Sequence, residues 1–334
     1  MVTVHDVAAR SGVSIATVSR TLREPHRVSD DTRDRVLAAI DELGYRPNRA
    51  AASLRRGRTG VIALVVPDIE NPYFSSMTKG AQAMSRERGY GLVVVDTTER
   101  ADVEDEEIRA LRSQIDGLIL ASSRLADERL AEVVAENTCV LINRDLGDDG
   151  PDIPSVTIDE SAAGRAAIDH LYGLGHRRVV YVGGPATSWS QARRSRGIAE
   201  AAAALPDLTL VELPDSTPTS AGGRAVAARA LQTGATAVIA YNDLVALGML
   251  AQWSESGVRV PDQISLMGFD NTFVTDLASP PLTSVGADLR ELGDAAVELL
   301  LERIDARGAA PEGDIHRSLH PRLAIRSSTA PPPA

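Results

Sequence analysis

The arginines near the start of the chain are the residues best suited to contact phosphate. Residues 1–60 contain eleven arginines and seven acidic residues, a net charge of +4, which leaves −15 for the rest of the chain. Five of the arginines form a run without any acidic residue: Arg46, Arg49, Arg55, Arg56 and Arg58. Clustered guanidinium groups can neutralise nucleic-acid phosphates, although a solvated linker has the same composition. Only this part of the chain has the charge to favour a polyanion.

A second group of residues could bind a small ligand. The chain has eleven aromatic residues, and six of them lie at or just after the ends of predicted strands: Tyr73, Phe74, Trp189, Tyr241, Phe269 and Phe273. In open α/β sheets, ligands bind in a crevice beyond the carboxyl ends of the strands. Sugars and nucleobases stack an apolar face on aromatic rings, while charged groups bind their hydroxyls or heteroatoms. The sequence therefore predicts a small-molecule site in this crevice.

Three short helices are expected at the N-terminus, over about residues 4–10, 15–22 and 30–43, from apolar residues that recur every three or four positions. A Ser-Gly-Val turn around Gly12 separates the first two, and Ser14 can cap the second. A helix, a tight turn containing glycine and a second helix form the helix-turn-helix pattern.

From Gly60 onward, short β-branched runs alternate with amphipathic stretches of about 10–18 residues. The nine runs are GVIALVVPD, GLVVVD, DGLILAS, CVLINRD, SVTIDE, RRVVYVGGP, TLVELP, TAVIAYND and QISLMGFD. Apolar strands that alternate with helices form parallel sheets covered on both faces. Nine or more such strands indicate two doubly wound lobes with a ligand crevice between them.

The N-terminal run VTVHDVAARSGVSIATVSRTL closely resembles the signature of the LacI repressor family, and RPNRAAASLRRGRTGVIALVVPD resembles that family's hinge and first core strand. The resemblance continues in family order through ENPYFSSMTKGAQ, IDGLIL, LINRDL, LGHRRVVYVGGP, AYNDLVALG, ISLMGFDN and PPLTSV. It implies an all-α helix-turn-helix headpiece with a hinge helix, followed by a two-lobed, doubly wound parallel α/β core of the periplasmic-binding-protein type. The expected segments are 1–46 for the headpiece, 47–59 for the hinge and 60–334 for the core, with lobe one at about 60–159 plus 288–320 and lobe two at about 160–287 plus a C-terminal strand.

For the headpiece, the resemblance places the second helix in the major groove of DNA. Arg20 can donate two hydrogen bonds to guanine O6 and N7, while methyl groups suit contact with the thymine methyl, and serine hydroxyls suit phosphates. Without the family pattern, Ile15 would be read as a residue of the headpiece core. The residues expected to contact DNA are Ser14, Ile15, Ala16, Thr17, Ser19 and Arg20.

The hinge is expected to contain a helix of eight residues, Arg49 to Arg56, which Asn48 can cap. Helices this short are marginal alone in water, so a partner should be needed for it to form. In the family this helix lies in the minor groove, and a leucine that matches Leu54 wedges between base pairs and kinks the duplex. The alternative is that Leu54 packs on the core. The expected DNA contacts in the hinge are Arg49, Ala51, Leu54 and Arg55.

For the core, the resemblance implies eight effector contacts: Asn71, Tyr73, Phe74, Arg144, Trp189, Arg194, Asn242 and Asp270. Arg144 and Asp270 could together hold vicinal hydroxyls. Both could instead be structural, since a carboxylate after a strand often caps the next helix, and Trp189 could cover the edge of a lobe. The chain departs from the family pattern at Ala287, where a glutamine that often reaches ligand is usual, and at Asp288, where proline is common.

The expected function is that of a homodimeric transcriptional repressor that binds a pseudo-palindromic operator in double-stranded DNA, with its affinity controlled by a small effector, expected to be a sugar. Release from DNA by the ligand and a requirement for a corepressor both fit the sequence. The alternative is a cytoplasmic sugar-binding protein or sugar-modifying enzyme without a role on DNA, or a periplasmic binding protein with the same core. The headpiece argues against each of these.

Other motifs set limits on the chemistry. The sequence has no G-x-G-x-x-G after the first strand, no P-loop, no G-x-S-x-G and no H-E-x-x-H, and its one cysteine, Cys139, lies in an apolar run. Catalysis, a cofactor and a metal are therefore not expected. The N-terminus lacks the layout of a secretory signal, and no segment approaches the length of a membrane helix, so a cytoplasmic protein without a membrane partner is expected.

Overall fold

The computed structural model describes residues 2–45, 58–147, 152–214, 216–306 and 314–333. The chain divides into two compact units, Met1–Gly60 and Val61–Ala334. The hinge helix predicted over Arg49–Arg56, with Asn48 as its cap, lies outside the described residues. Among the described helices, none is both long enough and apolar enough to span a membrane.

The N-terminal unit contains the predicted helix-turn-helix. Its elements are α1 (Val4–Ser11), α2 (Ile15–Arg23), the 3₁₀ turn η1 (Pro25–Arg27) and α3 (Asp30–Leu43). The Ser14 hydroxyl caps α2 by accepting the N–H of Thr17 at 3.1 Å. Helix α1 ends at Gly12, whose φ of 70° is a left-handed conformation that favours glycine, and this lets the chain turn directly into α2.

Small apolar side chains hold the three helices of this unit together. Val7, Val18 and Val36, one from each α-helix, are fully buried, and Ala8 and Ala39 complete the cluster. Because the core is so small, the helices lie close together, and the polar face of α2 remains on the surface.

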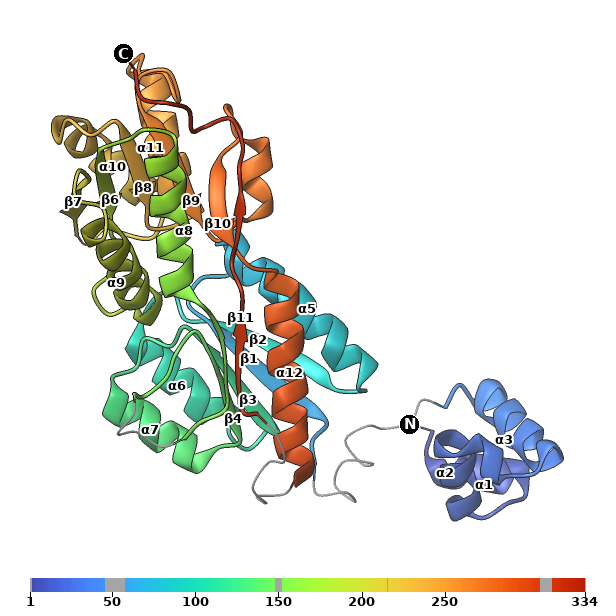
Figure 1. Ribbon diagram of the computed structural model, residues 1–334. Helices are drawn as coiled ribbons and strands as arrows, with labels where there is room; N and C mark the ends of the chain where they lie inside the picture. The colour runs from blue at the N-terminus through green and yellow to red at the C-terminus, as the bar shows by residue number, and fades with distance from the viewer. Residues whose placement is uncertain (1, 46–57, 148–151, 215, 307–313, 334) are drawn as a thin grey trace. The chain divides into compact units, whose positions relative to one another are not determined.

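The C-terminal unit contains two six-stranded sheets (Figure 1). The first has the strand order β11-β5-β4-β3-β1-β2, with β1 (Val61–Val66), β2 (Gly91–Asp96), β3 (Gly117–Ala121), β4 (Cys139–Ile142), β5 (Ser155–Ile158) and β11 (His316–Leu319). The second has the order β12-β10-β9-β8-β6-β7, with β6 (Arg178–Val182), β7 (Thr209–Leu213), β8 (Ala237–Ala240), β9 (Ser265–Phe269), β10 (Thr283–Gly286) and β12 (Arg322–Ala324). The strands pair in parallel except for β12, which runs antiparallel to β10.

The nine predicted apolar runs coincide with β1 to β9. Periodicity did not indicate β10, β11 and β12, which are three or four residues long and, in β11 and β12, contain charged side chains. These three strands complete the two sheets at one edge of each. The chain passes between the sheets after β5, after β10 and after β11, so three crossovers join the two lobes.

Helices cover both faces of each sheet, as predicted. On the first sheet, α5 (Pro72–Glu87) and α12 (Leu289–Ala306) pack on one face, and α6 (Ala101–Leu111) and α7 (Asp127–Glu136) pack on the other. On the second sheet, α8 (Glu160–Gly173) and α9 (Trp189–Ala203) pack opposite α10 (Ser220–Gln232) and α11 (Asp243–Glu255). The 3₁₀ turn η2 (Phe273–Leu277) follows β9.

Three of these helix pairs cross so closely that each helix has a glycine at the contact. A methyl group at Gly248 of α11 would lie 1.9 Å from the carbonyl oxygen of Ser220 in α10, and one at Gly223 of α10 would lie 2.0 Å from that of Val245 in α11. The same reciprocal arrangement occurs at α5–α12 and at α8–α9, through the pairs Gly80 with Gly293 and Gly164 with Gly197. The backbones of these helices are therefore in direct contact.

Replacement of Gly248 by alanine should force α10 and α11 apart, because the new methyl group would meet backbone rather than a movable side chain. We expect the free energy of unfolding to fall by about 1–3 kcal/mol. Urea unfolding followed by tryptophan fluorescence measures this, since both tryptophans lie in the C-terminal unit.

Gly173→Ala is the matched control, because no atom lies within 4 Å of the added methyl group at the end of α8. It should be neutral or stabilise by up to about 1 kcal/mol through helix propensity. Equal behaviour of the two variants would show that the close crossing does not matter for stability.

Candidate functional site

Backbone strain gathers at the carboxyl ends of the strands. Among the described residues, six non-glycine residues have a positive φ, between 48° and 97°, and all six lie within three positions after the end of β2, β3, β4 or β9: Thr98, Glu99, Ser122, Asn143, Asp270 and Asn271. Residues with side chains rarely adopt this conformation, and such strain is typical of functional sites. Four strand ends from two sheets therefore mark one region of the C-terminal unit.

Between the two sheets at these strand ends lies a small cavity, which we call the cleft. Its volume is about 30 Å³, roughly that of one water molecule. Pockets that hold small ligands are typically about 300–1,000 Å³, so the lobes or their side chains must move to admit a ligand. The residues that line the cleft are Asn71, Tyr73, Phe74, Glu99, Ser122, Arg124, Asn143, Glu160, Ser190, Arg194, Pro218, Tyr241, Asn242 and Asp270.

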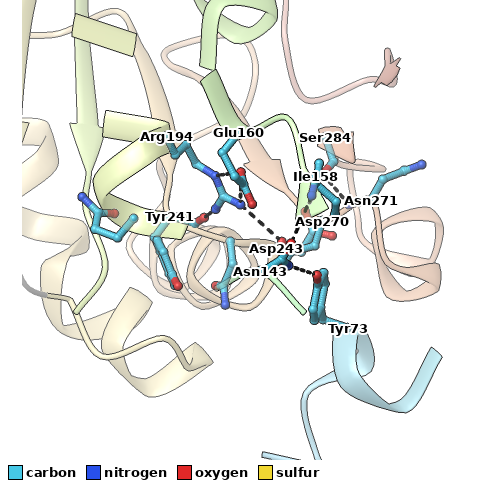
Figure 2. A network of polar contacts seen from close by, with 12 residues as sticks. Tyr73, Asn143, Ile158, Glu160, Arg194, Tyr241, Asp243, Asp270, Asn271 and Ser284 are labelled. Carbon is cyan, nitrogen blue, oxygen red and sulfur yellow. Dashed lines mark hydrogen bonds and ion pairs between the residues drawn. The ribbon is translucent and has the colours of Figure 1, made fainter. Parts of the chain in front are cut away.

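Arg194 of α9 is at the centre of the polar contacts in the cleft (Figure 2). Its guanidinium donates to Glu160 Oε2 at 2.7 and 2.8 Å and to the carbonyl oxygen of Tyr241, and it lies 3.8 Å from Asp270 Oδ1. The guanidinium also stacks on Phe269, 4.2 Å from the ring centroid. The side chains of Arg194 and Glu160 are only 5% and 2% exposed, so this is a buried ion pair.

Burial and neighbouring charges shift the pKa values of Arg194 and Asp270. Burial alone lowers the pKa of Arg194, but the charges of Glu160 and Asp270 outweigh it, and the net pKa is raised, so this guanidinium stays charged. Burial raises the pKa of Asp270 well above its usual value against the opposing effect of Arg194. A carboxyl group with a raised pKa in a cleft is a candidate ligand contact.

A second buried carboxylate fixes the loop that carries Asp270. Asp243 accepts hydrogen bonds from the backbone N–H and the hydroxyl of Thr272, at 2.7 and 2.8 Å, and from the hydroxyl of Ser284 at 2.7 Å. Burial raises the pKa of Asp243 to about 6, although these hydrogen bonds lower it. The Asn271 N–H donates to the same Ser284 hydroxyl at 3.0 Å, which holds the strained turn after β9.

The wall of the cleft on the side of the first sheet is held by asparagines. Asn143 donates to the Tyr73 hydroxyl and accepts the N–H of Ile158 at 3.1 Å (Figure 2). Asn71 caps α5 by accepting the N–H of Tyr73 at 3.0 Å. The rings of Tyr73 and Phe74 meet edge to face with centroids 5.0 Å apart. On the other wall, Asn242 caps α11 in the same way as Asn71 caps α5.

Six of the eight residues predicted to contact an effector therefore line the cleft: Asn71, Tyr73, Phe74, Arg194, Asn242 and Asp270. Arg144 does not line it. Its guanidinium contacts the carboxylate of Asp127 and the carbonyl oxygen of Leu125, because the left-handed conformation of Asn143 turns the chain there and brings the asparagine to the cleft.

Trp189 lies at the start of α9 with Arg193 stacked on its ring at 4.6 Å, and it lines a separate cavity of about 520 Å³ beside β5 and β11. Phe269 is buried beneath Arg194, whereas Phe273 is 61% exposed on η2. Asp288, which departs from the family pattern, caps α12 by accepting the N–H groups of Arg290 and Glu291. Its neighbour Ala287 packs against the core of the first lobe.

The residues that line the cleft but were not singled out from the sequence include Glu99, Ser122, Arg124 and Glu160. Each lies one to three positions after the end of a strand, in the runs DTTER, ILASSR and TIDE. Applying the strand-end criterion to polar residues as well as to aromatic ones would have found them.

In the N-terminal unit, helix α2 presents the residues predicted to contact DNA. Ser14, Ala16 and Arg20 are exposed, and Ile15, Thr17 and Ser19 are half-buried, with Ile15 packed against the small core. Among the described residues Arg20 makes no ion pair, whereas Arg10, Arg27, Arg33 and Arg35 are each paired with a carboxylate. The remaining predicted contacts, Arg49, Ala51, Leu54 and Arg55, lie outside the described residues.

Both units match known proteins. Residues 3–48 match the family described as "Bacterial regulatory proteins, lacI family", and residues 168–329 match the "Periplasmic binding protein-like domain". The HTH-type transcriptional regulator DegA of Bacillus subtilis (strain 168) is 31% identical over 98% of each sequence. The HTH-type transcriptional repressor CytR of Escherichia coli (strain K12) is 32% identical over 98% of this chain and 96% of CytR.

Solved structures agree with these relatives. The lac repressor dimer bound to operator and the anti-inducer ONPF matches with a TM-score of 0.85 at 28% identity, over 98% of this chain and 99% of that chain. The complex of the transcriptional regulator CelR with cellobiose matches with a TM-score of 0.72 at 30% identity, over 98% and 100% of the two chains.

The Arg194–Glu160 pair should dominate the stability of the C-terminal unit. Arg194→Met leaves Glu160 buried without its cation, and we expect the free energy of unfolding to fall by about 3–5 kcal/mol. The double variant Arg194→Met with Glu160→Gln should recover part of this loss, because neither buried charge then remains. Urea unfolding at neutral pH measures both.

A surface pair provides the control. Arg177→Met removes a partner of Asp207 at a site where the two side chains are 44% and 55% exposed, and it should cost less than about 1 kcal/mol. If Arg194→Met cost no more than Arg177→Met, the pair in the cleft would not be acting as a buried ion pair.

Proposed function

The chain belongs to the LacI family of bacterial regulatory proteins and is a DNA-binding transcriptional regulator, and on this premise we propose that it is a homodimeric repressor controlled by a sugar. In this proposal the dimer binds a pseudo-palindromic operator, and a sugar bound in the cleft sets its affinity. The close relatives are regulators rather than enzymes, so the cleft is assigned to binding and not to catalysis.

The observation that carries the proposal is the cleft itself. Paired carboxylates and guanidiniums from both lobes lie beside aromatic rings, a combination that suits a ligand with hydroxyl groups and an apolar face. The similar regulator CelR was solved with cellobiose. We propose Asn71, Tyr73, Phe74, Arg194, Asn242 and Asp270 as effector contacts, with Asn143 in place of Arg144.

DNA recognition is assigned to the exposed face of α2. Arg20 is free of carboxylate partners within the described residues and can donate two hydrogen bonds to a guanine, while Ile15, Ala16 and Thr17 offer methyl groups to thymine. Ser14 and Ser19 are assigned to phosphates. We propose minor-groove contacts for Arg49, Ala51, Leu54 and Arg55, where Leu54 would act as the wedge.

Two exposed apolar surfaces of the C-terminal unit support a homodimer. Phe273 and Leu277 of η2 are 61% and 77% exposed, and Ile325, just after β12, is 65% exposed. Strand β2 is the edge of the first sheet, and its Val93 and Val94 are also exposed. Exposed apolar groups on an edge strand and a neighbouring lobe are typical of a surface that a second chain covers.

Replacement of Arg20 by alanine should weaken operator binding by about 1–3 kcal/mol and relax the base preference at one position of each half-site. Binding titrations at fixed salt measure this, with a duplex selected from random sequences and with its single-base variants. Arg10→Ala, which removes a paired arginine from α1, should leave every base preference unchanged. If the preferences of Arg20→Ala also match those of the unaltered protein, Arg20 contacts only phosphate.

Operator affinity with and without sugars tests the regulatory proposal. We expect one sugar to change the operator affinity by about five- to 150-fold, which corresponds to a coupling free energy of about 1–3 kcal/mol. We also expect light scattering to give a mass equal to two chains. Asp270→Ala should abolish this response and keep ligand-free operator binding, because the reading helix lies in the other unit. A response that survives in Asp270→Ala contradicts the role of this carboxylate, and a monomeric protein contradicts the dimer.

A further inference from the structure

The cleft contains a second arginine, Arg124, whose guanidinium is also paired with a carboxylate. Arg124 Nε donates to Glu99 Oε2 at 2.6 Å, and one of its terminal nitrogens donates to the Ser122 carbonyl oxygen at 3.0 Å. The side chain of Arg124 is only 9% exposed. Its backbone N–H donates at 2.8 Å to Glu104, a carboxylate that is itself buried.

Each arginine of the cleft therefore has one carboxylate bonded to its guanidinium and a second carboxyl group nearby. Glu99 bonds the Arg124 guanidinium and Glu104 accepts the backbone N–H of Arg124, whereas Glu160 bonds the Arg194 guanidinium and Asp270 lies 3.8 Å from it. Among the described residues that line the cleft, the carboxyl side chains are those of Glu99, Glu160 and Asp270, the last with a raised pKa, and the basic side chains are two guanidiniums, with no lysine and no histidine. The cleft offers no unpaired cation to an anionic ligand.

This balance decides which ligands the cleft can hold. A phosphate group carries nearly two negative charges and needs cationic donors that are not already engaged. Here it would compete with carboxylates for both guanidiniums in a poorly hydrated space, where repulsion between like charges is strong. A neutral hydroxyl group, in contrast, can donate to a carboxylate and accept from a guanidinium without displacing either.

The backbone turn that carries Glu99 is held in place by hydrogen bonds. Thr98 and Glu99 both have left-handed backbones, with φ of 50° and 60°. The Glu99 N–H donates to the Pro67 carbonyl oxygen at 2.8 Å, and Asp96 fixes the same turn by accepting the N–H of Thr98 at 2.7 Å. A strained turn held by these hydrogen bonds directs a carboxylate against Arg124.

We propose that Glu99 is a specificity-determining residue, which neutralises Arg124 and makes the cleft selective for neutral polyhydroxylated ligands over their phosphorylated forms. The proposal rests on the proposed function, because it takes the cleft as the effector site. It adds the charge class of the effector and the residue that sets it.

The first test compares matched pairs of sugars on the unaltered full-length protein by calorimetry and thermal shift. The pairs are ribose with ribose 5-phosphate, glucose with glucose 6-phosphate, and fructose with fructose 1-phosphate, and cellobiose is added as a neutral disaccharide. We expect binding by at least one neutral sugar and binding at least tenfold weaker by its phosphate. Equal or tighter binding of a phosphorylated member overturns this inference but leaves a sugar-controlled repressor intact.

If no member of either kind binds while operator binding is normal, the sugar proposal itself fails, and this inference fails with it. The two failures are thus distinguishable in one experiment.

The second test removes the charge of Glu99. Glu99→Gln frees Arg124, and we expect the ratio of neutral to phosphorylated affinity to fall at least tenfold and inorganic phosphate to raise the melting temperature. Glu99→Asp keeps a carboxylate and should keep the discrimination. Glu255→Gln removes the partner of Arg224 from a surface pair at 2.9 Å and should leave the ratio as in the unaltered protein.

Urea unfolding followed by tryptophan fluorescence shows whether the C-terminal unit of each variant is folded, since both tryptophans lie in that unit. If folded Glu99→Gln keeps the ratio of neutral to phosphorylated sugar affinity, the proposed role of Glu99 is wrong. It is also wrong if Glu99→Asp loses the preference for neutral sugars, because the size of the side chain rather than its charge would then decide. If Glu99→Gln does not fold, the sugar pairs on the unaltered protein and the result for Glu99→Asp still decide the proposal.

Discussion

The buried guanidinium of Arg194 joins the ends of β8 and β9 to the crossover between the two sheets. Its partners are Glu160, which begins α8 after that crossover, the carbonyl oxygen of Tyr241, and Asp270. Removing such charges from water costs several kcal/mol each, so the arrangement is stable only because every group has a partner. The strained turns, the caps of α5 and α11 and the second pair at Arg124 all gather around this point. The geometry of the cleft is therefore a consequence of satisfying buried charge.

A cleft of about 30 Å³ filled by its own paired side chains has a direct bearing on regulation. Under the proposed function, a ligand would exchange some of these contacts for its own, so its binding would require the lobes or their side chains to rearrange. A switch needs two arrangements that a ligand can bias, and the cleft with and without ligand would provide them. Three crossovers join the two sheets, so a movement of one lobe against the other would have to change the conformation of these segments.

Sequence reasoning found those features that depend on local pattern. Strands β1 to β9 could be predicted because buried parallel strands are continuous apolar runs, whereas the pattern did not indicate β10 to β12, because they are only three or four residues long. A C-terminal strand in lobe two was expected from the family resemblance alone. The strand-end rule placed Tyr73 at the cleft, and the family resemblance placed Asp270 there. The resemblance also chose Arg144 over Asn143, although one left-handed residue decides which of these two neighbours faces inward. The Arg124–Glu99 pair joins residues 25 positions apart in the chain, and no local pattern reports such a partner. The glycines at the helix crossings were missed for the same reason, because a contact between backbones leaves no periodic signal.

Those glycines also make the two lobes mechanically unequal. Where two helix backbones touch, no layer of side chains lies between them that could change rotamer and absorb a displacement. We therefore expect such a helix pair to move as a rigid body. Among the described residues, the second sheet has a helix pair in backbone contact on each face, α8–α9 and α10–α11, whereas the first sheet has one such pair, α5–α12. On the remaining face, α6 and α7 rest on the sheet through ordinary side chains, and Glu104 of α6 reaches Arg124 in the cleft. If the core deforms when a ligand binds, we expect the α6–α7 layer of the first lobe to move more readily than the helix pairs in backbone contact, and this layer adjoins the Arg124–Glu99 pair.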